Sequence, residues 1–176
     1  LSEAGEPDDA ARLYMETGDW DGLARLILAN SKALIDQGRL QTLDGWLASI
    51  PVRIMKGAPW LLYYMGLCRL PFNQPLARRS LASAFDIFKK KRDRPGIFLS
   101  WIGVVNSYLY EMENLQPLDH WIQEFERLLK RHGGCPSETI WEQAAATMFS
   151  AMIFRQPQHR GISRWQAEAE SVMRKT

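Results

Sequence analysis

Three tryptophans at intervals of about 40 residues are the feature that most constrains the fold of this 176-residue chain. Trp60, Trp101 and Trp141 are 41 and 40 residues apart, and each falls in a segment with helical spacing of its apolar residues. A repeat of roughly 20 to 50 residues is typical of solenoids, in which each unit buries its apolar face only by stacking on the next. The spacing therefore predicts a series of similar helical units.

Proline and glycine divide this region into six predicted helices that form three pairs. The pairs are Pro59–Leu70 with Pro75–Arg92, Pro95–Met112 with Pro117–His132, and Ser137–Phe154 with Ile162–Arg174. The connections are short, which favours antiparallel helix hairpins. The second helices also carry bulky residues 40 positions apart, namely Phe85, Phe125 and Trp165. In the first hairpin, Ala77, Leu81 and Ala84 have the small, large, small spacing by which the second helix of a tetratricopeptide repeat packs on the first.

Before Gly57 the sequence predicts three further helices. The first begins at Pro7 to Asp9 and ends at Gly18. Asp19 can cap the second, which has one apolar face and ends at Gly38. The third carries Leu40, Leu43, Leu47 and Ile50 at helical spacing, with Trp46 beside them, and is interrupted by Pro51.

No segment alternates apolar and polar residues over the length of a strand, so the predicted fold class is all-α. We expect an α-solenoid of about ten helices, with a helical arm over residues 1–57 and three hairpins over residues 58–176. An irregular helical bundle with coincidentally spaced aromatic residues is the alternative. The chain opens at Leu1 in mid-pattern, which suggests a fragment of a longer protein.

The residues that most chemistry requires are sparse or scattered. Of the three histidines, only His132 has a cysteine nearby, Cys135, and two ligands do not make a closed metal site, so we expect no metal. Instead, we interpret His132 as a residue at a helix C-terminus that interacts with the helix dipole. No nucleophile motif or phosphate-binding glycine loop occurs, and the carboxylate pairs are two residues apart, on different sides of a helix. We therefore expect no enzyme activity and no cofactor.

Partners and location follow from charge and apolar content. The densest basic run, Lys89–Arg92, closes a predicted helix, where cations complement the carbonyl end; contact with phosphate is the alternative. No basic recognition helix is evident, so direct DNA binding is a minor alternative. Cys68 and Cys135 sit in unrelated contexts that favour reduced thiols, and no apolar run is long enough to span a membrane. We expect a cytoplasmic protein without membrane contact.

A solenoid has a concave groove lined by the first helix of each hairpin, which suits a small-molecule effector or a protein partner. If the tryptophans occupy equivalent positions, four residues project toward this groove: Arg69, Asn106, Tyr110 and Glu142. Simple solvent exposure is the alternative for each of them. Self-association of the chain is a further expectation.

The first third of the chain resembles a known family. The segments Ala4–Ala10, Gly18–Asp21 and Gly38–Arg39, followed by Leu43, Trp46–Leu47 and Ile50–Pro51, are similar to MalT-like regulators, the large ATP-dependent LuxR-type transcriptional regulators of bacteria. The specific match covers roughly residues 4–70, with Pro59, Leu61 and Gly66 at its end. The rest matches only as generic repeat, and the second and third hairpins keep bulky residues where tetratricopeptide repeats usually have Ala or Gly.

In this family a P-loop ATPase and a winged-helix segment precede a tetratricopeptide-like sensor domain, and a C-terminal helix-turn-helix binds DNA. The resemblance implies that this chain is the sensor region and that DNA binding belongs to domains absent from it. Effector or partner binding would then shift the parent regulator between two states. The alternatives are a free-standing tetratricopeptide scaffold and an enzyme whose active site is assembled from scattered residues.

Overall fold

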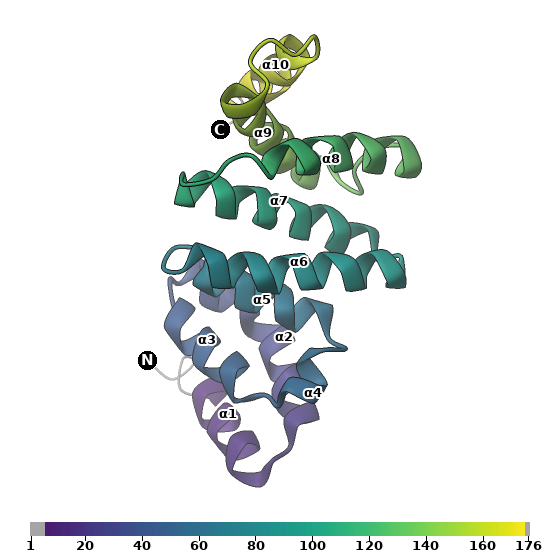
Figure 1. The fold of residues 1–176 in the computed structure, drawn as a ribbon. Coiled ribbons are helices and arrows are strands. Elements are labelled where there is room, and N and C mark those ends of the chain that lie inside the picture. The colour runs from purple at the N-terminus through teal and green to yellow at the C-terminus, as the bar shows by residue number, and fades with distance from the viewer. Residues whose placement is uncertain (1–5, 175–176) are drawn as a thin grey trace. The chain divides into compact units, whose positions relative to one another are not determined.

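The computed structural model describes residues 6–174 and consists of ten helices joined by short connections (Figure 1). No strand occurs within this range, so the predicted all-α class is confirmed. Ala4 and Gly5, which begin the family-like segment, lie outside the described residues. The helices form two compact units that divide between Ala84 and Phe85, inside α6. The predicted division into residues 1–57 and 58–176 rests on the repeat pattern and stays a prediction.

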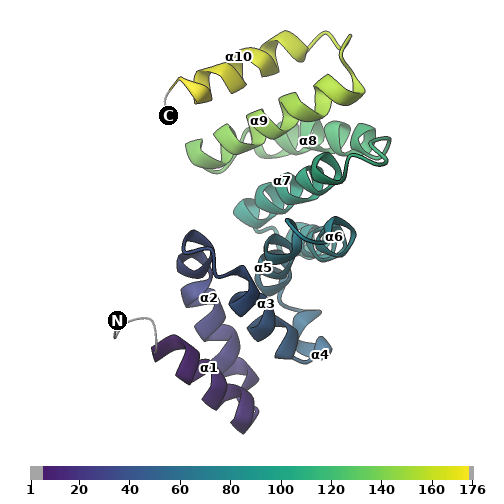
Figure 2. The same cartoon turned by 90° about the vertical axis from the view of Figure 1, so that its left-hand side faces the viewer.

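The first unit contains five whole helices and the beginning of a sixth. They are α1 (Glu6–Thr17), α2 (Trp20–Asp36), α3 (Leu40–Ser49), α4 (Val52–Met55), α5 (Pro59–Arg69) and α6 (Gln74–Lys91). Helix α2 packs against α1, α3 and α5, and α3 packs against α5. Figure 2 shows α1 and α2 side by side, joined by a tight turn. The short helix α4 was not predicted from the sequence.

The predicted helix boundaries in this unit have local causes. The Asp19 carboxylate accepts a hydrogen bond of 2.8 Å from the Gly22 amide and so caps α2, as expected. Gly18 and Gly38 end α1 and α2 with φ of 70° and 73°, a conformation that glycine adopts without steric cost. The predicted apolar face of α2 is buried at Leu23, Ile27 and Leu34, whereas Trp20 is half-buried.

Helices α5 and α6 pack closely at Gly66. A Cβ at Gly66 would lie 2.4 Å from Leu81 Cγ and 3.2 Å from the carbonyl oxygen of Ala77. Ala77, Leu81 and Ala84 are all fully buried, so the packing predicted from their small, large, small spacing is confirmed. The missing side chain of Gly66 is what allows the second helix of this pair to approach the first.

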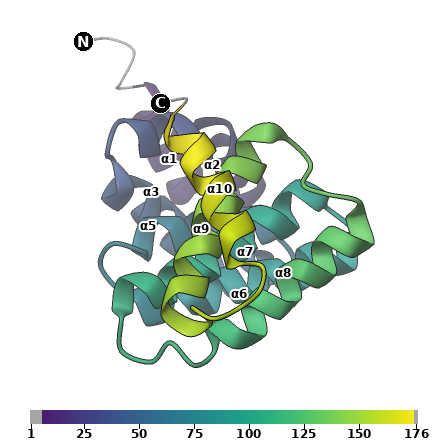
Figure 3. The same ribbon diagram turned by 90° about the horizontal axis from the view of Figure 1, so that it is seen from above.

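The second unit contains the end of α6 and the four remaining helices. These are α7 (Arg94–Glu111), α8 (Leu118–His132), α9 (Glu138–Arg155) and α10 (Ile162–Met173). Helix α7 packs against α8 and α9, and α9 also packs against α8 and α10. Figure 3 shows α10 lying along α9. Each of the predicted helices in this unit is present, with ends displaced by one residue at most.

Aromatic rings form the core of the second unit. The Trp101 and Phe125 rings stack with centroids 4.2 Å apart, and Phe125 also contacts Trp165 at 5.6 Å. The Trp101 indole donates a 2.8 Å hydrogen bond to the carbonyl of Trp121, so its polar atom is satisfied in the interior. The aromatic residues of the second helices, Phe85, Phe125 and Trp165, are all buried.

The three repeat tryptophans are not packed equivalently. Trp101 is fully buried, whereas Trp60 and Trp141 are half-buried. Trp60 is the second residue of α5, Trp101 the eighth of α7 and Trp141 the fourth of α9. Each therefore lies at a different point along its helix. The idea that they occupy the same packing position is therefore wrong. A fixed interval along the chain does not fix the position within a helix when the helices begin at different points of the repeat.

Candidate functional site

The four residues predicted to line a groove are divided between the two units, and their role in binding stays a prediction. Arg69 is in the first unit and Asn106, Tyr110 and Glu142 are in the second. Arg69 Nε donates a 2.8 Å hydrogen bond to the Asp44 carboxylate, which links α5 to α3. Arg69 also lines an open hollow beside the exposed side chains of Phe72 and Leu76. Its role in the structure is to hold α5 on α3.

Asn106 and Tyr110 lie together in a hollow of about 360 Å³ between α7 and α9. We call it the α7/α9 hollow. Its lining residues are Asn106, Leu109, Tyr110, Ala146, Thr147, Ser150 and Phe154. Helices α7 and α9 are the first helices of the second and third predicted hairpins, from which the groove was expected to form. Asn106 and Tyr110 therefore share one hollow on these helices, and the binding of an effector there stays a prediction.

The chemistry of the α7/α9 hollow is polar but uncharged. An amide, a phenol and two hydroxyl groups share it with aliphatic and aromatic carbon, and none of the lining residues carries a formal charge. Tyr110 is 59% exposed and Phe154 is 50% exposed, so two aromatic rings are available to a ligand. The Ser150 hydroxyl donates to the carbonyl of Ala146 and keeps acceptor capacity. Such a surface can stack against and hydrogen-bond an uncharged polar molecule.

Glu142 lies one turn before this hollow on α9. Residues 142, 146, 150 and 154 are four apart and therefore share one stripe of the helix. Glu142 is half-buried and is not among the residues that line the hollow. Phe154 is the last residue of this stripe and lines the hollow. It was not predicted as a site residue, although its spacing of four residues from Ser150 is visible in the sequence.

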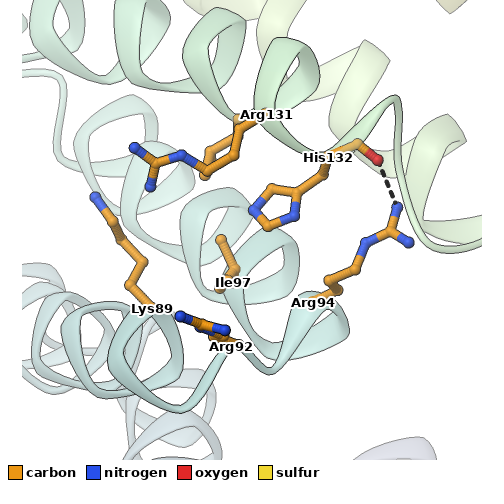
Figure 4. Close-up of a pocket in the computed structure, with 7 residues that line it drawn as sticks. Lys89, Arg92, Arg94, Ile97, Arg131 and His132 are labelled. Atoms are coloured by element: carbon orange, nitrogen blue, oxygen red, sulfur yellow. Dashed lines mark hydrogen bonds between the residues drawn. The ribbon is translucent and has the colours of Figure 1, made fainter.

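A second hollow, of about 470 Å³, is lined mainly by cationic side chains (Figure 4). It lies where α6 ends, α7 begins and α8 ends, and we call it the basic hollow. Its lining residues are Lys89, Arg92, Arg94, Ile97, Leu128, Arg131 and His132. Helix α6 ends at Lys91, as predicted from the basic run. The sequence did not indicate that the end of α8, some 40 residues later, meets this run.

The cationic side chains of the basic hollow differ in their hydrogen-bond partners. Lys89 Nζ donates a 2.6 Å hydrogen bond to Glu124, whose buried carboxylate also accepts one of 2.8 Å from Arg127. Arg94 donates to the main-chain carbonyls of His132 and Gly134, at 3.1 and 3.4 Å. Within residues 6–174, no carboxylate pairs with Arg92 or Arg131.

The pKa of His132 reflects its burial and the positive charge around the basic hollow. Burial lowers the pKa of its imidazole, and the cations Arg94 and Arg131 lower the pKa further. His132 is the last residue of α8, as expected. The ring is also held edge to face against Phe98, with centroids 6.0 Å apart. Burial and the neighbouring cations therefore favour the neutral imidazole.

Other reactive groups offer little chemistry. Cys68 and Cys135 are both free, and burial raises the pKa of each thiol to about 12, which disfavours the nucleophilic thiolate at neutral pH. Among the described residues, no three His, Cys, Asp or Glu side chains lie close enough together to hold a metal ion. In the same part of the chain, every helix is too short or too polar to cross a membrane.

Comparison with protein-family models, with curated proteins and with solved structures finds no match to this chain.

Proposed function

We propose that this chain is an effector-sensing and protein-interaction module, built as an α-solenoid of helix hairpins, whose α7/α9 hollow binds an uncharged polar effector. The observation that carries the proposal is the meeting of Asn106 and Tyr110 on α7 with Phe154 on α9 in one hollow. The exposed rings of Tyr110 and Phe154 provide stacking surface, while Asn106 and Ser150 provide donors and acceptors.

The location of the hollow suits a sensor. A ligand that contacts both α7 and α9 bridges two consecutive hairpins, so its binding energy depends on the distance and angle between them. If the parent protein has two states that differ in this packing, the ligand favours the state to which it binds more tightly. Sensing then requires no catalytic group within the chain.

We propose further that the module is the sensor region of a MalT-like transcriptional regulator in bacteria. The family-like residues have structural roles here: Gly18 and Gly38 end helices, and Trp46, Leu47 and Ile50 are buried. The resemblance therefore concerns the framework of the first helices and not a ligand site. In this proposal, ATP hydrolysis and DNA binding belong to other domains of the parent protein, and a free-standing scaffold that binds a protein segment is the competing function.

The test is a ligand screen on the purified 176-residue chain with neutral sugars, polyols, amides and nucleosides, followed by titration of each compound that raises the melting temperature. The double variant Tyr110→Ala/Phe154→Ala should weaken binding by about tenfold or more, the loss expected when two stacking surfaces are removed. Both side chains are exposed, so the fold should be retained.

Ile153→Ala is the matched control. Ile153 is 46% exposed and precedes Phe154 on α9, but it does not line the hollow. Its affinity for the same compound should equal that of the wild type. If a compound bound both variants as tightly as the wild type, the α7/α9 hollow would not be its binding site.

A further inference from the structure

We propose that the basic hollow is a second binding site, for a small molecule that carries a phosphate monoester group. The hollow is separate from the α7/α9 hollow and shares no residue with it. Nothing in the proposed effector function requires it, so the two proposals can fail independently.

Like charges converge at the basic hollow. Figure 4 shows the Lys89 ammonium and the Arg131 guanidinium pointing toward each other across the hollow, with Arg92 on the side of Lys89. Among the described residues, Glu124 is the carboxylate that approaches this group, and it is shared between Lys89 and Arg127. Cations that face one another repel, and an anion between them relieves the repulsion.

The helix ends explain only part of the positive charge at the hollow. Both α6 and α8 end at the hollow, and cations at a helix C-terminus can simply complement its carbonyl groups. Arg94 has that role, because it donates to the carbonyls of His132 and Gly134. Arg92 and Arg131 do not bond these carbonyls. Arg92 also has a φ of 58°, in a region that favours glycine, directly after the end of α6. Helix complementation therefore accounts for Arg94 but leaves two guanidinium groups directed to the hollow.

The chemistry of the lining side chains favours a phosphate group as the ligand. A guanidinium presents parallel N–H donors that match two oxygens of a phosphate, and several cations together suit a dianion better than a single carboxylate. The buried side chains of Ile97 and Leu128 add apolar surface beside the charges. A volume of about 470 Å³ exceeds the need of a bare ion and lies within the roughly 300 to 1,000 Å³ of small-molecule sites. The cations surround one hollow and do not form the extended stripe that a nucleic acid requires.

His132 provides a reporter inside the site. Its imidazole is neighboured by Arg94 and Arg131, and it lines the same hollow as Lys89 and Arg92. A bound dianion adds negative charge next to the ring and should raise the pKa of His132 toward or above its ordinary value. The His132 ring-proton shift, followed by NMR over pH, therefore detects an anion in the hollow and not elsewhere on the surface.

The experiment titrates the chain with phenyl phosphate, inorganic phosphate and phenol at fixed ionic strength, using calorimetry and the His132 signal. We expect saturable binding of phenyl phosphate, weaker binding of inorganic phosphate, no binding of phenol and a raised His132 pKa in the complex. The variant Arg92→Gln/Arg131→Gln should bind phenyl phosphate roughly 10 to 100 times more weakly, as expected for lost charge-assisted hydrogen bonds. Both side chains are exposed, so folding should be unaffected.

The matched control is Lys90→Gln/Lys130→Gln. It removes the same two positive charges from exposed positions next to the hollow, but neither lysine lines it. This variant should bind phenyl phosphate as the wild type does. Equal weakening in both double variants would show a diffuse charge effect and overturn the proposal, as would the absence of saturable binding.

Binding to vesicles and to an oligonucleotide distinguishes a small phosphate monoester from other sources of phosphate. Binding to vesicles that contain phosphatidic acid without binding to soluble phenyl phosphate would overturn the small-molecule proposal, and so would tighter binding of an oligonucleotide. Tyr110→Ala/Phe154→Ala should leave phenyl phosphate affinity unchanged, which distinguishes failure of this proposal from failure of the effector proposal.

Discussion

Replacing Gly66 by alanine tests the contact on which the α5–α6 pair depends. In the structure, the new Cβ would lie 2.4 Å from Leu81 Cγ, 2.9 Å from its Cδ2 and 3.2 Å from the Ala77 carbonyl oxygen. Leu81 is fully buried, and Cγ is the branch point of its side chain, so the clash cannot be relieved by turning one methyl group. Helix α6 must move away from α5, or Leu81 must leave its rotamer.

The magnitude follows from two opposing effects. Alanine in a helix interior is more favourable than glycine by about 0.8 to 1.0 kcal/mol. Overpacking of a well-packed core costs about 1 to 3 kcal/mol. Gly66→Ala should therefore lower the free energy of unfolding by up to about 2 kcal/mol. Gly45, within α3, is exposed, and a Cβ there meets no described atom within 4 Å. Gly45→Ala should raise the free energy of unfolding by about 0.4 to 1 kcal/mol.

The assay is urea unfolding of the wild type and both variants, followed by circular dichroism and tryptophan fluorescence. Coincidence of the two signals establishes whether a two-state analysis holds for each protein. The expected order of unfolding midpoints is Gly45→Ala, wild type, Gly66→Ala. If Gly66→Ala were as stable as Gly45→Ala, the close approach of α5 and α6 would be wrong.

Two other substitutions test the second unit. Trp101→Ala removes a fully buried ring and its hydrogen bond to the Trp121 carbonyl and should cost about 3 to 5 kcal/mol in urea unfolding; a loss below about 1 kcal/mol would contradict its place in the core. The hydrogen bond from Arg155 lowers the pKa of Asp119 below its ordinary value of 3.8, with a further contribution from Gln156. The stability that wild type gains over Asp119→Asn should therefore be complete above pH 3.8 and decline as the pH falls through the lowered pKa; a gain independent of pH would refute the ion pair.

The helices could be predicted because their ends have local causes. Asp19 caps α2, Pro59 begins α5, and glycine or proline follows several other helices. Such signals act within a few residues, so they can be read without knowledge of the fold. Helix α4 has four residues and no periodicity to detect, which explains why it was missed.

Packing was harder to predict than the helices. The 40-residue interval located segments correctly, yet Trp101 is buried while Trp60 and Trp141 are half-buried. Which side of a helix faces the core depends on where that helix begins, and the interval contains no information on this. Asn106 and Tyr110 line one hollow, whereas Glu142 lies outside its lining and Arg69 belongs to the other unit.

The basic hollow also could not be predicted from the sequence, because its cations come together only through tertiary packing. Lys89 and Arg92 were visible as one run, and Arg131 lies about 40 residues further along the chain. Their convergence depends on α6 and α8 ending on the same side of α7, which is a property of tertiary packing. From the sequence alone, each basic group was adequately explained as the end of its own helix.

Determining the coding sequence on both sides of this chain tests whether it is the sensor module of a bacterial transcriptional regulator, as we propose. We expect an upstream domain with a P-loop nucleotide-binding motif and a downstream helix-turn-helix in the same reading frame. A reading frame that encodes neither domain would refute this proposal and would favour a free-standing helical scaffold.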